Sequence, residues 1–131
     1  MNKQPPQDML DQARSAIDHA YCPYSNYPVA ACVKASDGTL FSAINVENAA
    51  YNLCCCAETN AITHMVSSGR QQIIECLVLV DRPSIASPCG ACRQRLFEFA
   101  DGNIPVYLCS TSGEFNLQYL EDLLPHAFGP Q

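Results

Sequence analysis

The chain has 131 residues, a formal net charge of −6 and 48% hydrophobic residues, so we expect one globular domain, residues 1–131, with a substantial core. An acidic chain without a cluster of Lys and Arg lacks the cationic surface that polynucleotides require, which argues against a nucleic-acid partner. No apolar run approaches the roughly 18 residues of a membrane helix, so we expect no membrane partner either.

The first third of the chain predicts one helix and two strands. Residues 1–7 are polar, contain two prolines and are expected to be flexible. Apolar residues then recur at spacings of three and four over residues 9–20, which predicts an amphipathic helix. Strands are predicted at 29–35 and 39–46, and the Asp37-Gly38 pair between them indicates a hairpin turn.

The rest of the chain alternates helices and strands. The predicted segments are a helix from Cys56 to Gly69, a strand at 73–80, a helix from Cys89, strands at 104–110 and 114–117, and a helical turn at 119–124. The segment 73–80 is almost wholly apolar, which is typical of a strand covered on both faces. This alternation indicates an α/β domain with a mixed sheet.

Two short motifs place three thiols and one carboxylate in the pattern of a hydrolytic zinc site. Cys56 and Glu58 lie two residues apart, and Cys89 and Cys92 follow in the sequence Pro-Cys-Gly-Ala-Cys. A catalytic zinc takes three protein ligands and leaves a fourth position for water. The three cysteines are therefore the predicted ligands, and Glu58 is the remaining acid.

Both predicted helices of this site begin at a cysteine. The partial positive charge of a helix N-terminus favours a thiolate and lowers the pKa of the thiol. Cys56 and Glu58 would diverge inside a helix, so they converge on one water molecule only if Cys56 lies at the irregular helix start. Glu58 would then accept a proton from water and later deliver it to the leaving group.

A non-catalytic reading of the same residues stays open at this point. A structural zinc module would use the same cysteines, with Cys54 or Cys55 as a fourth ligand, and Glu58 would only favour the helix dipole. Nine cysteines is an odd number, and three of them form the metal-like set. We therefore expect a reducing, cytoplasmic setting rather than a disulfide framework.

The sequence resembles the small, homotetrameric, three-cysteine cytidine deaminases over residues 13–130. The matching segments are Ala20-Tyr21-Cys22-Pro23-Tyr24-Ser25, Asn45-Val46-Glu47-Asn48-Ala49, Cys56-Ala57-Glu58, Pro88-Cys89-Gly90-Ala91-Cys92-Arg93-Gln94 and Leu123-Leu124-Pro125-His126-Ala127-Phe128-Gly129-Pro130. The resemblance implies a three-layer α/β domain, a mixed five-stranded sheet flanked by helices, and one zinc ion per subunit. It also implies hydrolysis of cytidine and deoxycytidine to uridine and deoxyuridine in pyrimidine salvage.

The resemblance further implies which residues contact the small nucleoside substrate. Asn45 and Glu47 would hold the ribose 3′-hydroxyl, and the Ala57 amide would bind the pyrimidine O2. Tyr27 would lie near the base, where the family usually has Phe. A last group would complete the pocket of a neighbouring subunit in a homotetramer with shared active sites: Ala49, Tyr51 and Phe128. Without the family, an Asx turn at Asn45 and core packing of the aromatic residues would be the simpler readings.

Three other functions remain as alternatives to a cytidine deaminase. They are a deaminase of a modified nucleoside such as blasticidin S, a polynucleotide-editing deaminase, and the structural zinc module. The acidity of the chain disfavours the editing enzyme. One departure concerns the metal: family members commonly have Arg directly after the catalytic Glu, whereas this chain has Thr59. Partners of that kind tune the charge and affinity of a metal site.

Overall fold

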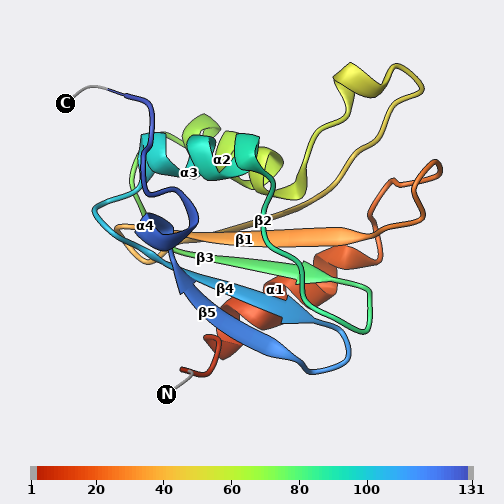
Figure 1. Cartoon of the computed structure of the whole chain (residues 1–131), viewed down its shortest axis with the longest axis horizontal. Helices are drawn as coiled ribbons and strands as arrows, with labels where there is room; N and C mark the ends of the chain where they lie inside the picture. The colour runs from red at the N-terminus through yellow and green to blue at the C-terminus, as the bar shows by residue number, and fades with distance from the viewer. Residues whose placement is uncertain (1–2, 130–131) are drawn as a thin grey trace.

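The computed structural model describes residues 3–129 as one five-stranded sheet with helices on both faces (Figure 1). In chain order the elements are α1 (Gln7–Ile17), β1 (Val29–Ala35), β2 (Leu40–Ile44), the 3₁₀ helix η1 (Tyr51–Leu53), α2 (Ala57–Ser67), β3 (Ile73–Val80), α3 (Gly90–Phe99), β4 (Pro105–Ser110), β5 (Phe115–Tyr119) and α4 (Leu120–Leu123). The predicted three-layer α/β architecture with a mixed sheet is confirmed.

The strand order of the sheet is β2-β1-β3-β4-β5. β3 and β4 run parallel because the crossover through α3 separates them, and the other neighbouring pairs are antiparallel. The parallel pairing aligns Val80 with Ser110 at the ends of their strands. The loop that leaves β3 towards α3 therefore starts beside the loop that leaves β4.

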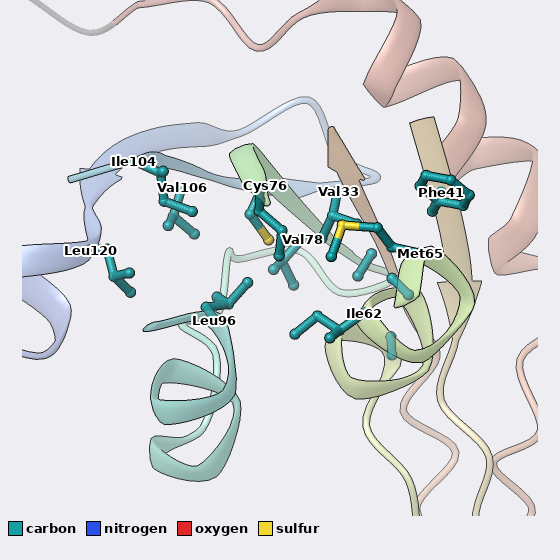
Figure 2. Packing of buried hydrophobic residues seen from close by; sticks show 14 of the residues in the cluster. Val33, Phe41, Ile62, Met65, Cys76, Val78, Leu96, Ile104, Val106 and Leu120 are labelled. Atoms are coloured by element: carbon teal, nitrogen blue, oxygen red, sulfur yellow. The ribbon is translucent and has the colours of Figure 1, made fainter. Parts of the chain in front are cut away.

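Two apolar cores lie on opposite faces of the sheet. The side chains of Leu77 and Leu79 pack towards α1 on one face. Those of Cys76 and Val78 face α2 and α3 and pack in one cluster with Leu96 (Figure 2). The alternation along β3 explains its almost wholly apolar sequence, since both faces of this strand are covered by helices. The prediction of a doubly covered strand at 73–80 is confirmed.

Three boundaries, two in α1 and one in β5, differ from those expected. α1 begins at Gln7, the last residue of the segment expected to be flexible, and Met1 and Asn2 of that segment lie outside the described residues. α1 also ends at Ile17 rather than near residue 20, with Asp18 as its C-cap. β5 continues to Tyr119, where a strand ending at 117 was predicted.

The prediction that β2 runs to residue 46 is wrong. β2 ends at Ile44, and Val46 instead makes isolated bridges to Tyr21 and Cys55. The chain then leaves the sheet in a long segment that carries η1, which the sequence pattern did not predict (Figure 1). Within residues 3–129, no helix combines the length and the apolar character needed to cross a membrane.

Candidate active site

The first two cysteines of the motifs lie at the N-caps of two helices. Cys56 precedes α2 with φ −70° and ψ 152°, and Cys89 precedes α3 with φ −64° and ψ 164°. Both residues thus have extended backbone immediately before the first helical turn. This is the irregular helix start that the convergence of Cys56 and Glu58 requires. Cys92 lies in the first turn of α3 and is fully buried.

The three cysteine sulfurs form one cluster. The Sγ atoms of Cys56, Cys89 and Cys92 all lie within 4.8 Å of one another, and the Cys56 and Cys89 sulfurs are 3.9 Å apart. Tetrahedral zinc with Zn–S bonds of about 2.3 Å places two sulfurs about 3.8 Å apart. A hydrogen bond from Cys92 lowers the pKa of the Cys56 thiol, which favours the thiolate that a metal binds. The donor set and its spacing therefore fit zinc.

Glu58 is the buried carboxyl of this site. It lies in the first turn of α2, and only 4% of its surface is exposed. Burial raises the pKa of the Glu58 carboxyl, while hydrogen bonds from its own backbone amide and from Cys92 act in the opposite direction. A carboxyl with a raised pKa is suited to both accept and donate a proton.

A pocket of about 190 Å³ opens onto this carboxyl and two of the sulfurs. The predicted site residues that line it are Tyr27, Asn45, Cys56, Ala57, Glu58 and Cys89. The pocket wall also includes apolar side chains from β1 and β3 and the segment before Cys89. Six predicted residues from four separate segments of the sequence thus meet around one space.

Two larger hollows are less suited to chemistry. A groove of about 940 Å³ runs between α3 and the C-terminal segment, and one of about 370 Å³ lies between α2 and α3. Neither is lined by Glu58 or by any of the three clustered cysteines. We therefore assign the reaction to the smaller pocket, because it alone of the three contains a buried acid beside a metal-binding cluster.

Thr59 contacts the cysteine cluster directly. Its Oγ1 lies 3.6 Å from the Sγ of Cys92, within reach of a hydroxyl-to-sulfur hydrogen bond. Arg93 points elsewhere: its guanidinium donates to the carbonyls of Pro88 and Leu123, both at 2.8 Å. The sequence pattern assigns Arg93 no role, and these bonds tie the start of α3 to the loop before it and to the end of α4.

Cys54 and Cys55 lie outside the cluster and are exposed. The Cys54 sulfur accepts a hydrogen bond from the Asn48 amide at 3.3 Å, and the Cys55 thiol lies 3.7 Å from the Leu53 carbonyl. All nine cysteines lie within the described residues, so the cluster has three sulfurs and no fourth. This composition disfavours a closed structural zinc site.

Asn45 lines the pocket and also holds the start of β1. Its Oδ1 accepts from the Val29 amide at 3.1 Å, and its Nδ2 donates to the Tyr27 carbonyl at 2.8 Å. Glu47 is only partly exposed and is not among the residues that line the pocket. Its carboxylate accepts hydrogen bonds from the amides of Tyr24 and Ser25 and from the Ser25 hydroxyl, and these bonds lower its pKa.

The three residues expected to serve a neighbouring subunit are exposed and lie away from the pocket. Ala49 and Tyr51 belong to the segment between β2 and α2 that extends from the body of the molecule (Figure 1). The side chain of Phe128 is 85% exposed, although Gln94 on α3 bonds both the amide and the carbonyl of that residue. Pro130, the last residue of the matching segment, lies outside the described residues.

Comparisons with known proteins all point to one family. The profile described as "Cytidine and deoxycytidylate deaminase zinc-binding region" matches residues 3–108. A cytidine deaminase of Sporosarcina psychrophila is 39% identical over 123 residues, which cover 94% of this chain and 90% of that protein. One from Halalkalibacterium halodurans is 36% identical, with 93% of this chain and 92% of that protein covered.

A solved structure is similar over almost the whole fold. The crystal structure of cytidine deaminase from Burkholderia pseudomallei superposes with a TM-score of 0.89 at 35% sequence identity. The superposition covers 95% of this chain and all of that one. The similarity therefore includes the sheet, both helices that begin at cysteines, and the segments that surround the pocket.

Proposed function

This chain belongs to the cytidine and deoxycytidylate deaminase family, and we propose that it hydrolyses cytidine and deoxycytidine to uridine and deoxyuridine with release of ammonia. The observation that carries this proposal is the buried carboxyl of Glu58 beside a cluster of three cysteine sulfurs at one end of a small pocket. The whole chain acts as one domain, since both apolar cores share a single sheet.

The cofactor is zinc, held by Cys56, Cys89 and Cys92. When bound, it supplies a Lewis acid that lowers the pKa of water towards about 7. Three thiolates donate more negative charge than three imidazoles would, which makes a nearby base more important. The α2 and α3 N-termini stabilise this charge, and the Thr59 hydroxyl contacts one of the sulfurs.

Glu58 moves the protons of the reaction. Its carboxylate accepts a proton from the attacking water and transfers it to the ring nitrogen next to C4. The second proton of that water then passes through the same carboxyl to the exocyclic amine, which leaves as ammonia. Burial of Glu58 supports this double role, because a pKa raised towards neutrality makes the carboxyl both a base and an acid.

The residues around the pocket bind the nucleoside. The Ala57 amide, at the first position of α2, has no partner within the helix and is available for the pyrimidine O2. Tyr27 flanks the base, and Asn45 with Glu47 holds the ribose 3′-hydroxyl. The negative charge of Glu47 disfavours a phosphorylated sugar, which supports a free nucleoside over a nucleotide.

We further propose a homotetramer in which neighbouring subunits share active sites. Ala49, Tyr51 and Phe128 would complete the pocket of the adjacent subunit. The exposure of Tyr51 supports this idea, because its ring, 76% exposed, packs edge-on against the exposed ring of Tyr24, and grouped apolar side chains on a surface are typical of interaction sites. The small size of the single-chain pocket, about 190 Å³, also supports a wall supplied from elsewhere.

We place the reaction in the cytoplasm, within pyrimidine salvage. The nine cysteines are all unpaired, which supports a reducing compartment. A free nucleoside substrate supports salvage, because such a reaction recycles a base that is already attached to its sugar.

An ultraviolet assay of cytidine loss tests the function. We expect turnover of cytidine and deoxycytidine, loss of that turnover with a chelator, and recovery with added zinc. Competition with cytidine monophosphate and with blasticidin S separates the substrate classes, and we expect neither to compete at concentrations where cytidine saturates. Preferential turnover of blasticidin S, or zinc binding without turnover of any nucleoside, would contradict the proposal.

A further inference from the structure

Arg82 stacks on the aromatic ring that flanks the pocket. It lies in the loop after β3, and its Cζ is 4.5 Å from the centroid of the Tyr27 ring. At that distance a guanidinium is attracted to the face of an aromatic ring. Tyr27 lines the pocket and Arg82 does not, so the ring separates the arginine from the space where the substrate would lie.

Arg82 is held both at its guanidinium and at its backbone carbonyl. Its Nη1 donates to the Asp81 carbonyl at 2.8 Å, and its Nη2 donates to the Asn26 carbonyl. Its own carbonyl accepts a hydrogen bond from the hydroxyl of Ser110, a buried residue at the end of β4. The arginine therefore connects the loop after β3, the end of β4 and the loop before β1.

The loop that Arg82 holds is the one that positions Tyr27. Asn26 has φ 54°, a left-handed conformation that non-glycine residues seldom adopt, and its carbonyl is the one that Arg82 binds. On the other side, the Tyr27 carbonyl accepts from Asn45. The backbone of Tyr27 is thus fixed by its neighbours, and the position of its ring depends on the guanidinium that faces it.

We propose that Arg82 is a positioning residue that holds the Tyr27 ring in place as a wall of the nucleoside pocket. This inference rests on the proposed function of that pocket. Arg82 acts on binding and not on the proton transfers of Glu58, because it reaches the substrate only through the ring. Its loss frees the ring to rotate, so the pocket must be re-formed each time that a nucleoside binds.

The test compares Arg82→Ala with wild type and with Arg70→Ala. Arg70 is a matched control, since its Cζ also lies over an aromatic ring, 5.5 Å from the Phe41 centroid, but far from the pocket lining. For Arg82→Ala we expect KM for cytidine to rise about three- to tenfold with kcat within about twofold of wild type. Calorimetry should show a similar rise in Kd for uridine, and Arg70→Ala should change neither constant.

A second substitution distinguishes positioning from general destabilisation. In a Tyr27→Leu background the arginine has no ring to hold, so adding Arg82→Ala should leave KM and Kd unchanged. Arg82→Gln retains an amide donor for the Asn26 carbonyl and replaces Arg82→Ala as the test if the alanine variant fails to fold. It should also weaken uridine binding.

Several results would overturn this inference. One is an unchanged Kd for uridine in Arg82→Ala or Arg82→Gln, and another is a fall in kcat without a change in KM. A third is an equal rise in KM and Kd on Arg82→Ala with and without the Tyr27 ring. A wild type that deaminates cytidine while the Arg82 variants bind uridine normally refutes only the role of Arg82. A wild type that neither deaminates cytidine nor binds uridine refutes the proposed function itself, and the role of Arg82 with it.

Discussion

At the scale of single residues, the geometry assigns metal binding and proton transfer to different side chains. The three sulfurs cluster within 4.8 Å of one another, while Glu58 is a fourth group, buried in the pocket wall. A structural site would need neither the buried carboxyl nor the pocket. The two tasks should therefore be separable by substitution.

Glu58→Gln tests that separation. The amide fills the same volume but cannot accept a proton, so we expect turnover to fall by about 10²- to 10⁴-fold. Zinc should remain at one ion per chain, because the cysteine ligands are untouched. Metal analysis and the cytidine assay on the same sample measure both quantities, and a fully active variant would refute the role of Glu58.

Thr59→Arg tests how the charge of the thiolates is balanced. Thr59 contacts the Cys92 sulfur at 3.6 Å and borders a groove between α2 and α3 of about 370 Å³. An arginine there has space to extend, and its charge would favour the thiolates. We expect the variant to fold and retain zinc, as judged by competition with a chromogenic chelator, and complete loss of zinc would contradict this account.

The cysteine cluster and the carboxyl of Glu58 could be predicted from the sequence because the spacing within each motif is local. Cys56 with Glu58, and Cys89 with Cys92, lie within one helical turn of each other. Arg82 and Tyr27 are 55 positions apart, one in the loop after β3 and the other in the loop before β1. No spacing rule in the sequence therefore indicates their contact. The Thr59 contact also required coordinates, because it depends on how α2 and α3 pack.

At the scale of elements, the structure that depends on local sequence signals was predicted correctly. The structure that depends on contacts between distant residues was not. The Asp37-Gly38 turn and the apolar run of β3 carry their structure in their own residues. The end of β2 depends instead on Val46, which leaves the ladder to pair with Tyr21 and Cys55, two residues outside the sheet. η1 spans three residues, too few to show any periodicity.

Gly38→Ala tests the hairpin between β1 and β2. Gly38 has φ 90°, where a Cβ meets no neighbouring atom but the backbone itself is strained. We expect the free energy of unfolding to fall by about 1 kcal/mol, as measured by urea titration of the zinc-loaded protein. Gly90→Ala is the control, because Gly90 begins α3 in open space without a positive φ. An equal effect of both substitutions would contradict the turn argument.

At the scale of the whole molecule, the exposed aromatic residues form the surface that the proposed homotetramer would cover. Phe128 is 85% exposed although Gln94 fixes its backbone against α3. A side chain that is held in place yet presented to water is consistent with a partner surface. The sequence pattern alone does not predict such a partner surface, because the association of subunits depends on the shape of the folded subunit.

Phe128→Ala tests the shared pocket. An exposed ring contributes little to folding, so the stability of the isolated subunit should change by less than about 0.5 kcal/mol. Turnover of cytidine should nevertheless fall by about tenfold or more, because a neighbouring pocket loses a wall. Sedimentation of the wild type should give a tetramer, and a fully active monomer would contradict the shared-site proposal.

The most direct test of the account is a zinc titration of metal-free protein with cytidine turnover followed at each step. If Cys56, Cys89 and Cys92 hold the ion beside Glu58, activity should rise in proportion to zinc and saturate at about one ion per chain. Turnover that is complete before any zinc is added, or that never appears although one ion is bound per chain, would contradict the account.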